Sequence, residues 1–376
     1  MTVTSSTDAA TEGHEAVALL ERTRTAVHPE LRSAVESLPG SVRRVAMYHF
    51  GWEHADGTQA AGPAGKAIRP ALVLAAERAL AGDPAGDPAG EPTRDQQHAA
   101  AGRQSAGAGP RQSAVRAAVA VELAHNFTLL HDDVIDEDPT RRHRATAWTV
   151  FGTPDAIIAG DAMMALALRL FAEDPHPASA AASARLATCV IELCAGQQAD
   201  CAFEQRGPHE VSLDECVAMA MSKTGALLGT SCALGALYAG AEEEQVAALD
   251  AFGREAGLAF QLIDDLIGIW GDPDRTGKPA GADLAAHKKS LPVVAALASG
   301  TPAAEELAEL YRSPMDDAAV RRAADAVERA GGRDWAQFEA ADRMSRAVHQ
   351  LSRAVPDLSA GDDLLALAEF VTRRNR

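Results

Sequence analysis

The sequence has few aromatic residues and few cysteines. Phe, Trp and Tyr together make up 4% of its 376 residues, and there are 5 cysteines. The cysteines form no C-x-x-C motif and no zinc-like spacing with histidine, which argues against a structural zinc site. We expect them to be buried thiols.

Basic charge and long apolar runs are also scarce. Lys and Arg number 35 against 53 Asp and Glu, and the formal net charge of -18 has the wrong sign for a nucleic-acid binder. No apolar run is long enough to span a membrane, and the first residues lack the basic and apolar segments of a secretory signal. The sequence therefore predicts a cytoplasmic protein without a transmembrane segment.

What the sequence does contain is an apolar pattern typical of helices. Hydrophobic residues make up 47% of the chain and recur at i, i+3, i+4 and i+7, which predicts an all-α, single-domain helix bundle. Ser212 and Glu215 form an S-x-x-E capping box, and Gly240 ends the apolar run that this box opens. Helices are expected at residues 14–37, 41–53, 66–82, 112–138, 153–173, 177–205, 212–239 and 242–271, with shorter ones from 285 to 373.

Two segments depart from this pattern. Residues 1–13 are expected to be a flexible N-terminus, so that the helical domain spans residues 14–373. Residues 81–113 are rich in Pro, Gly and Ala and repeat the unit A-G-D-P. Such a segment cannot bury enough apolar area to offset its ordering entropy, so we expect a disordered insertion. A docking segment for another protein is the alternative.

The motif H-D-D-V-I-D places Asp132, Asp133 and Asp136 within a helical run. At 100° per residue, Asp132 and Asp136 lie about 40° apart on one helix face, one turn apart along the axis. Carboxylates at this spacing can share a divalent cation, and their apolar neighbours argue against an exposed acidic turn.

A second acidic pair, Asp264 and Asp265, lies in another apolar helical run. Buried carboxylates without cations would be costly, so the two clusters are expected to face each other across a cavity that holds Mg²⁺, which prefers oxygen ligands. Lys and Arg residues in four short motifs would then bind a polyphosphate. An interior lined by Ala and Leu implies that the rest of the substrate is hydrocarbon.

Taken together, these motifs resemble those of the trans-isoprenyl diphosphate synthases, or polyprenyl synthetases. This family of head-to-tail prenyltransferases includes the farnesyl and geranylgeranyl diphosphate synthases. The resemblance runs from about Gly65 to Pro292 and rests, in order, on G-K-x-x-R-P, D-D-x-x-D followed by R-R, G-Q-x-x-D, K-T-G, F-Q-x-x-D-D and G-K-P-x-G-x-D-L. It implies the isoprenoid synthase fold, a large helix bundle with a central apolar cavity.

The resemblance also implies roles for individual residues. The metal ligands, for three Mg²⁺ ions that Mn²⁺ can replace, would be Asp132, Asp133, Asp136, Asp264 and Asp265. The allylic diphosphate would be bound by Arg141, Lys223, Thr224, Gln261 and Lys278. The diphosphate of isopentenyl diphosphate would be bound by Lys66, Arg69, His125 and Arg142. Catalysis would depend above all on Asp132, Asp133, Arg141, Lys223, Asp264 and Lys278. By the same resemblance we expect a homodimer.

The implied reaction condenses isopentenyl diphosphate with an allylic diphosphate by ionisation, condensation and elimination. Metal ions and cationic side chains stabilise the leaving diphosphate, while an apolar wall excludes water. The chain departs from the family pattern at Gly268, where the second acidic motif often has Asp. We expect activity to survive this difference, and a carboxylate restored there should change the rate only modestly.

Two residues upstream of the first acidic motif are expected to set the product length. Phe127 and Thr128 precede Asp132 by five and four residues and would form the floor of the product channel, which favours geranylgeranyl diphosphate. Farnesyl diphosphate and longer products are alternatives. On an ideal helical wheel Phe127 lies about 140° from Asp132, so ordinary core packing is an alternative role for Phe127.

The same motifs bear on other reactions and roles. A class I terpene cyclase would share the fold and the first acidic motif, but it would bind one diphosphate substrate and usually carry an N-S-E type second motif. Head-to-head condensation is disfavoured by G-K-x-x-R-P and R-R. A non-catalytic partner subunit or docked cargo is the alternative from a different class, and only the 81–113 segment and Gly268 hint at it.

Overall fold

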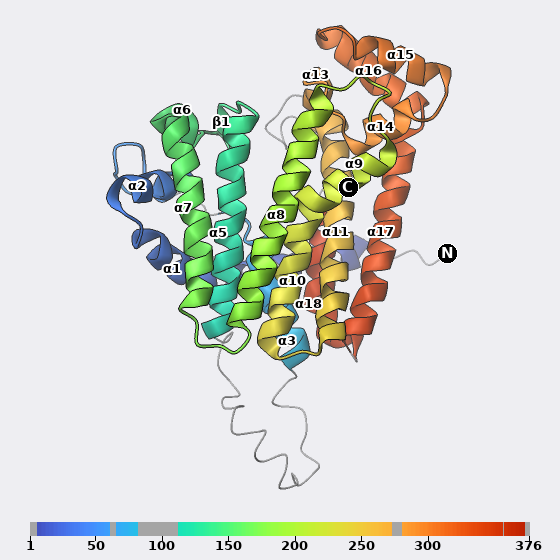
Figure 1. Cartoon of the computed structure of the whole chain (residues 1–376). Coiled ribbons are helices and arrows are strands. Elements are labelled where there is room, and N and C mark those ends of the chain that lie inside the picture. Colours follow the sequence, from blue (N-terminus) through green and yellow to red (C-terminus); the bar gives the residue numbers. More distant parts are fainter. Residues whose placement is uncertain (1–5, 61–64, 82–111, 273–279, 356, 373–376) are drawn as a thin grey trace.

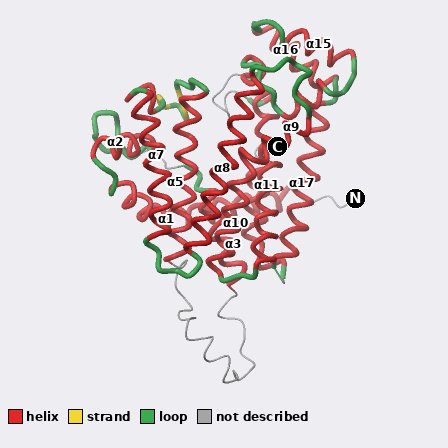
Figure 2. The backbone as a smooth tube through the Cα atoms, in the orientation of Figure 1, coloured by secondary structure: helices red, strands yellow, loops and turns green. Residues whose placement is uncertain are grey.

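The computed structural model describes residues 6–60, 65–81, 112–272, 280–355 and 357–372. These residues are almost entirely helical, with a single two-stranded hairpin (Figure 2). The all-α class predicted from the sequence is thus confirmed. Apart from its first and last residues, the segment 81–113 lies outside the described residues.

The N-terminal half of the chain contributes the helices that surround the first acidic motif. In order, its elements are α1 (Ser6–Glu36), α2 (Gly40–His49), α3 (Ile68–Ala81), α5 (Gln112–Ile135), β1 (Thr140–Arg141), β2 (Arg144–Ala145), α6 (Ala147–Phe151), α7 (Thr153–Ala172) and α8 (Ser179–Glu204).

The C-terminal half carries the K-T-G motif and the second acidic motif. Its elements are α9 (Leu213–Ala220), the π-helical turn η1 (Met221–Gly225), α10 (Ala226–Ala239), α11 (Glu243–Trp270), α13 (Ala282–Ala285), α14 (Leu291–Leu297), α15 (Pro302–Leu310), α16 (Asp317–Arg329), α17 (Gly332–Ala354), the 3₁₀ turn η2 (Leu358–Gly361) and α18 (Asp362–Thr372).

With the exception of residues 212–239, each long helix expected from the apolar pattern is present, with shifted ends. α1 already begins at Ser6, inside the segment expected to be flexible, because residues such as Ala9, Ala10 and Glu12 favour helix. The helix expected at 112–138 ends at Ile135, since Glu137 has a φ of 52° and cannot continue it.

The run 212–239, expected as one helix, is divided by η1. The capping box of Ser212 and Glu215 is present at its start, and Gly240 ends it with a left-handed φ of 76°. Between them, Met221–Gly225 adopts π-helical geometry. Single π turns within helices are rare and occur frequently at functional sites, and this one contains the K-T-G motif.

The long helices α5, α7, α8, α10, α11 and α17 lie side by side in the bundle (Figure 1). Glycines allow α10 and α11 to approach closely: a Cβ at Gly257 would lie 2.8 Å from the Cα of Gly225. The C-terminal ends of α5, α8 and α11 reach the same end of the bundle, near the hairpin and α13 (Figure 1). Both acidic motifs therefore lie at that end. Among the described helices, none combines the length and hydropathy needed to cross a membrane.

Candidate functional site

The first acidic cluster lies at the C-terminal end of α5. Asp132 is half-buried, and burial raises its pKa to about 6, although Lys223 opposes the shift. Asp136 lies in the turn after the helix, where its N–H donates to the Asp132 carbonyl oxygen at 2.8 Å. Burial also raises the pKa of Asp136, and Lys223 is again the cation that opposes it most. These two carboxylates therefore share one lysine.

Asp133 has a different partner. Its side chain is buried, and its Oδ1 accepts a hydrogen bond from Arg141 Nε at 2.6 Å. Its Oδ2 is buried and has no hydrogen-bond partner among the described residues. Burial raises the pKa of Asp133 even though Arg141 opposes the shift. Asp133 thus holds Arg141 in place.

The R-R motif lies on the β1–β2 hairpin, in which Arg141 pairs with Arg144. Arg142 and His143 form the turn with left-handed φ values of 52° and 62°. This turn lays Arg142 over Gly65 of the G-K-x-x-R-P motif, where a Cβ would lie 2.9 Å from both terminal guanidinium nitrogens. The Arg142 guanidinium occupies the space that a side chain at position 65 would use, so the two motifs are neighbours.

The residues predicted to bind isopentenyl diphosphate lie around this contact. Arg69 is in the first turn of α3, and burial together with Arg69 and Arg142 holds the pKa of His125 well below its ordinary value. His125 is therefore neutral. Lys66 is exposed. The carboxylate of Glu122 is buried in the same group: burial raises its pKa, and Arg69 opposes the shift. The cluster is thus cationic around one buried acid.

The K-T-G motif contacts the G-Q-x-x-D motif of α8. A Cβ at Gly196 would lie 2.6 Å from the backbone nitrogen of Lys223, so α8 packs directly on the π turn. One helical turn further on, Asp200 accepts a hydrogen bond from Lys223 Nζ at 2.5 Å. The Thr224 hydroxyl donates to Gln261 Oε1 of α11 at 2.7 Å. The π turn therefore joins α8 to the helix that carries the second acidic motif.

The two acids of that motif differ in environment. Asp264 is exposed, whereas Asp265 is buried. The carboxylate of Asp265 accepts from Gln261 Nε2 at 2.7 Å and from the Leu291 N–H at 2.9 Å. Burial outweighs these bonds and raises the pKa of Asp265 to about 7. Asp265 is thus held by two hydrogen bonds within the protein.

Lys288 and Asp200 belong to the site although neither was assigned a role from the sequence. Burial lowers the pKa of Lys288, but Asp283, Asp200, Asp265 and Asp136 outweigh it and raise the pKa overall. Lys288 thus interacts with both acidic clusters at once. The sequence signal was the K-K-S-L-P stretch that follows G-K-P-x-G-x-D-L.

Gly268, the departure from the family pattern, lies directly against Asp283. A Cβ at Gly268 would lie 2.5 Å from the carboxyl carbon of Asp283, closer than real Cβ contacts come. Asp283 is part of α13, and its carbonyl accepts the backbone N–H of Lys288 at 2.9 Å. The carboxylate of Asp283 therefore fills the space that a side chain at position 268 would use.

The two candidate chain-length residues point to different neighbours. Phe127 packs edge-to-face on His131, with ring centroids 4.7 Å apart. Both rings lie against Gly160 of α7, where a Cβ would come 2.5 Å from His131 Cδ2 and 3.5 Å from Phe127 Cδ2. Thr128 is buried and donates to the His125 carbonyl oxygen at 2.7 Å. Phe127 thus faces α7.

Lys278, predicted to bind the allylic diphosphate, lies outside the described residues. Over the ranges that are described, no three Asp, Glu, His or Cys side chains come together as a ready-made metal site. The candidate ligands are instead distributed over the ends of α5 and α11.

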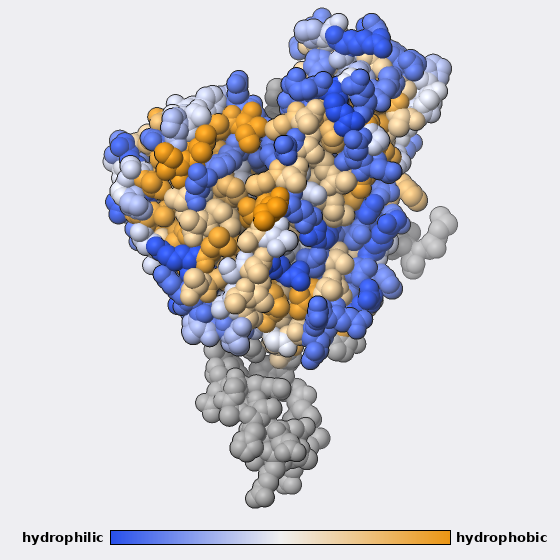
Figure 3. Space-filling model, viewed as in Figure 1, coloured by the Kyte–Doolittle hydropathy of each residue, from blue (hydrophilic) through white to orange (hydrophobic). Residues whose placement is uncertain are grey.

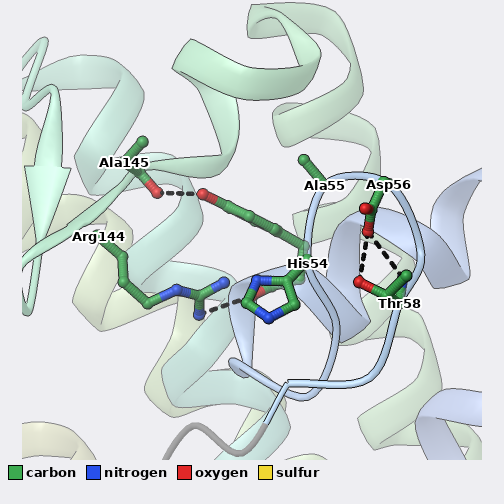
Figure 4. Close-up of a pocket in the computed structure, with 7 residues that line it drawn as sticks. His54, Ala55, Asp56, Thr58, Arg144 and Ala145 are labelled. Carbon is green, nitrogen blue, oxygen red and sulfur yellow. Dashed lines mark hydrogen bonds between the residues drawn. The ribbon is translucent and has the colours of Figure 1, made fainter.

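A pocket of about 510 Å³ lies beside the hairpin (Figure 4). The Tyr48 hydroxyl donates to the Ala145 carbonyl at 2.8 Å across it, and Arg144 donates to the Tyr48 carbonyl at 3.1 Å. None of the predicted site residues lines it. Its walls are formed by Tyr48, His54, Ala55, Asp56, Thr58, Arg144 and Ala145.

The family model described as polyprenyl synthetase matches residues 55–330. The chain is 46% identical over 360 residues to a geranylgeranyl diphosphate synthase of Mycobacterium tuberculosis, covering 95% of this chain and 93% of the relative. It is 40% identical over 354 residues to a (2E,6E)-farnesyl diphosphate synthase of Mycobacterium bovis, covering 93% and 90%.

Solved structures show the same similarity. A polyprenyl synthetase from Streptomyces coelicolor aligns with a TM-score of 0.82 and 42% identity over 94% of this chain and 98% of its own. A geranylgeranyl pyrophosphate synthase from Corynebacterium glutamicum, complexed with calcium and isoprenyl diphosphate, aligns with a TM-score of 0.72 and 28% identity over 95% and 96%.

Proposed function

The chain belongs to the polyprenyl synthetase family, and on that premise we propose that it condenses isopentenyl diphosphate with allylic diphosphates to make geranylgeranyl diphosphate. The chain is a short-chain prenyltransferase by this membership. The choice of product is the finer part of the proposal.

The observation that carries the proposal is the presence of two separate anion-binding groups at one end of the bundle. Arg142, lying on Gly65 and grouped with Arg69 and His125, belongs to a first cationic group around Glu122. Lys223, which interacts with Asp132, and Lys288, which interacts with acids of both motifs, form a second group. Guanidinium and ammonium groups suit phosphate oxygens. Two such groups fit two diphosphate substrates.

The acidic motifs fit hard divalent ions because their candidate donors are carboxylate oxygens. We assign direct contact to Asp132, Asp136 and Asp264. Asp133 and Asp265, which the sequence also suggested as ligands, orient Arg141 and Gln261 through the bonds described above. Three Mg²⁺ ions, which Mn²⁺ could replace, would bind together with the allylic diphosphate. When bound, they stabilise negative charge on the leaving diphosphate.

The side chains of the site then divide the reaction between them. Lys223, Arg141 and Lys278 bind the allylic diphosphate and stabilise the charge that develops as its C–O bond breaks. Thr224 fixes Gln261 on the same side of the site. Lys66, Arg69, Arg142 and the neutral His125 bind isopentenyl diphosphate so that its double bond can attack the allylic carbon. The released diphosphate takes up the proton that is then lost, so no basic side chain is required.

The geranylgeranyl product rests on Phe127 and on the similarity to the Mycobacterium tuberculosis enzyme. Phe127 packs with His131 against Gly160 of α7, and we expect it to limit the length of the product channel there. Farnesyl diphosphate is the second candidate because a farnesyl diphosphate synthase is 40% identical over nearly the same span.

Steady-state kinetics on the purified chain test this function. Diphosphate release should require isopentenyl diphosphate, an allylic diphosphate and Mg²⁺ or Mn²⁺ together. Release from the allylic substrate alone would favour a terpene cyclase. Absence of turnover with every primer would favour a non-catalytic subunit or docked cargo.

The proposal also includes a homodimer, a domain that spans residues 14–373 and a cytoplasmic location. Apolar surface gathers on the face where α7 and α8 lie (Figures 1 and 3), and Ile158 and Ile191 are 52% and 72% exposed on these helices. A second copy of the chain would cover them. Sedimentation of the wild type and of Ile191→Asp tests the dimer, which the substitution should dissociate. Cell fractionation tests the location.

A further inference from the structure

Glu122, Asn126 and His49 form a chain of hydrogen bonds, and Glu122 interacts with the cations proposed to bind isopentenyl diphosphate. Glu122 and Asn126 are one turn apart on α5, and both are buried. Asn126 Nδ2 donates to the Glu122 carbonyl oxygen at 2.8 Å and lies 3.2 Å from the Glu122 carboxylate Oε1. On its other side, Asn126 Oδ1 lies 3.2 Å from Nε2 of His49, at the end of α2.

The donors and acceptors in this chain can be assigned. A carboxylate only accepts, so the amide nitrogen of Asn126 must face Glu122 and the amide oxygen must face His49. His49 then donates from Nε2–H. Burial, with Arg141 and the other arginines of the hairpin adding to it, lowers the pKa of His49 to about 3, so the ring is neutral. The hydrogen bonds from His49 to Asn126 and from Asn126 to Glu122 therefore fix the Glu122 carboxylate.

The Glu122 carboxylate interacts with two arginines. Arg69 comes from α3 and Arg142 from the hairpin, and these are the two cations that act on the Glu122 carboxylate. Two guanidinium groups repel each other, and a buried carboxylate is unfavourable without cations. The Glu122 carboxylate interacts favourably with both arginines, which come from separate elements.

We propose that Glu122, held by Asn126 and His49, is a positioning residue that presents Arg69 and Arg142 to the diphosphate of isopentenyl diphosphate. This role rests on the proposed function. It goes beyond the binding residues assigned above. Glu122 is negatively charged, as the diphosphate is, so it acts through the arginines and not by binding the substrate itself. Its removal therefore has two opposing consequences for binding.

Glu122→Gln separates these consequences by their sign. If Glu122 acted only as a nearby negative charge, its loss would lower the KM for isopentenyl diphosphate. If Glu122 positions the arginines, the KM should rise about tenfold, equivalent to about 1.4 kcal/mol. The KM for the allylic diphosphate and kcat should stay within about twofold. Asn126→Leu should raise the same KM by a smaller factor, and Glu122→Asp should restore part of the affinity.

Glu192→Gln is the matched control. Glu192 on α8 also binds an arginine, since its Oε1 accepts a hydrogen bond from Arg254 Nη1 at 2.7 Å, but it belongs to no proposed substrate site. It should leave both KM values unchanged. Thermal unfolding of every variant checks that the fold is intact.

An unchanged or lower KM for isopentenyl diphosphate in a folded Glu122→Gln protein would overturn the positioning role. An equal rise in both KM values would overturn it as well, because a general structural loss affects both sites. If Glu122→Gln does not fold, the same criteria apply to Asn126→Leu and Glu122→Asp. Wild-type protein that fails to condense the two substrates would instead refute the proposed function.

Discussion

Replacing Gly268 with alanine should lower activity while leaving stability almost unchanged. The new Cβ would lie 2.5 Å from the carboxyl carbon of Asp283 and nearer still to its Oδ2, whereas ordinary contacts begin at 3.4 Å, so the carboxylate must retreat by at least about 0.9 Å. Alanine favours the helix by about 1 kcal/mol over glycine. Overpacking costs typically 1–3 kcal/mol, and less where a side-chain end can move. The two effects nearly cancel in the free energy of unfolding.

The site is affected more because Asp283 adjoins Lys288, which interacts with both acidic clusters. A displacement of about 1 Å at such a position can lower kcat/KM by about tenfold to a hundredfold. The sequence alone predicts a modest effect for a carboxylate at position 268. The space that Asp283 already occupies means that Gly268→Asp should be at least as harmful as Gly268→Ala.

The assay is steady-state kinetics with both substrates, combined with thermal unfolding. Gly40→Ala is the control, since a Cβ there meets nothing within 4 Å. Asp283→Asn should cause a similar loss, and adding Gly268→Ala to it should lower activity little further, because the two changes affect one contact. Wild-type kcat/KM in folded Gly268→Ala protein would refute this reasoning.

Four other substitutions test separate parts of the account. Asp132→Asn should lower kcat by several powers of ten, and excess chelator should abolish wild-type turnover; activity that survives chelation would exclude a metal role. Phe127→Ala should yield longer products and Thr128→Phe shorter ones, measured by mass spectrometry; unchanged products in both active variants would place the channel floor elsewhere. Burial lowers the pKa of His49 from 6.5 to about 3, so only the unfolded state takes up this proton as pH falls below 6.5. Protonation of His49 in the unfolded state should lower the free energy of unfolding by about 2 kcal/mol by pH 5. In urea unfolding, the stability of His49→Gln should therefore fall less between pH 7 and 5 than that of the wild type. An equal fall in both proteins would contradict the lowered pKa.

Features that depend on one helix could be predicted from the sequence. The apolar period located the long helices, the capping box at Ser212 is present, and the spacing of Asp132 and Asp136 placed both near one lysine. Helical periodicity fixes the direction of a side chain relative to its own axis. That is enough to identify a motif and the face on which it lies.

Periodicity does not tell which neighbouring element a side chain meets. The motif assigned Asp133 a role in metal binding, but its hydrogen bond to Arg141 of the hairpin could not be predicted from the motif. Lys288 was missed because its partners come from the ends of several elements far apart in the sequence. The reason for glycine at position 268 could not be read either, since Asp283 approaches it from α13. These contacts arise only when the helices pack.

The most direct test is to follow isotopically labelled isopentenyl diphosphate into the product of the purified chain, with Mg²⁺ and farnesyl diphosphate present. Two diphosphate sites that act together predict a C20 diphosphate whose mass increases by the label of one isopentenyl unit. A product that contains only allylic carbon, whether hydrolysed or cyclised, would contradict the assignment of Arg69 and Arg142 to a second substrate.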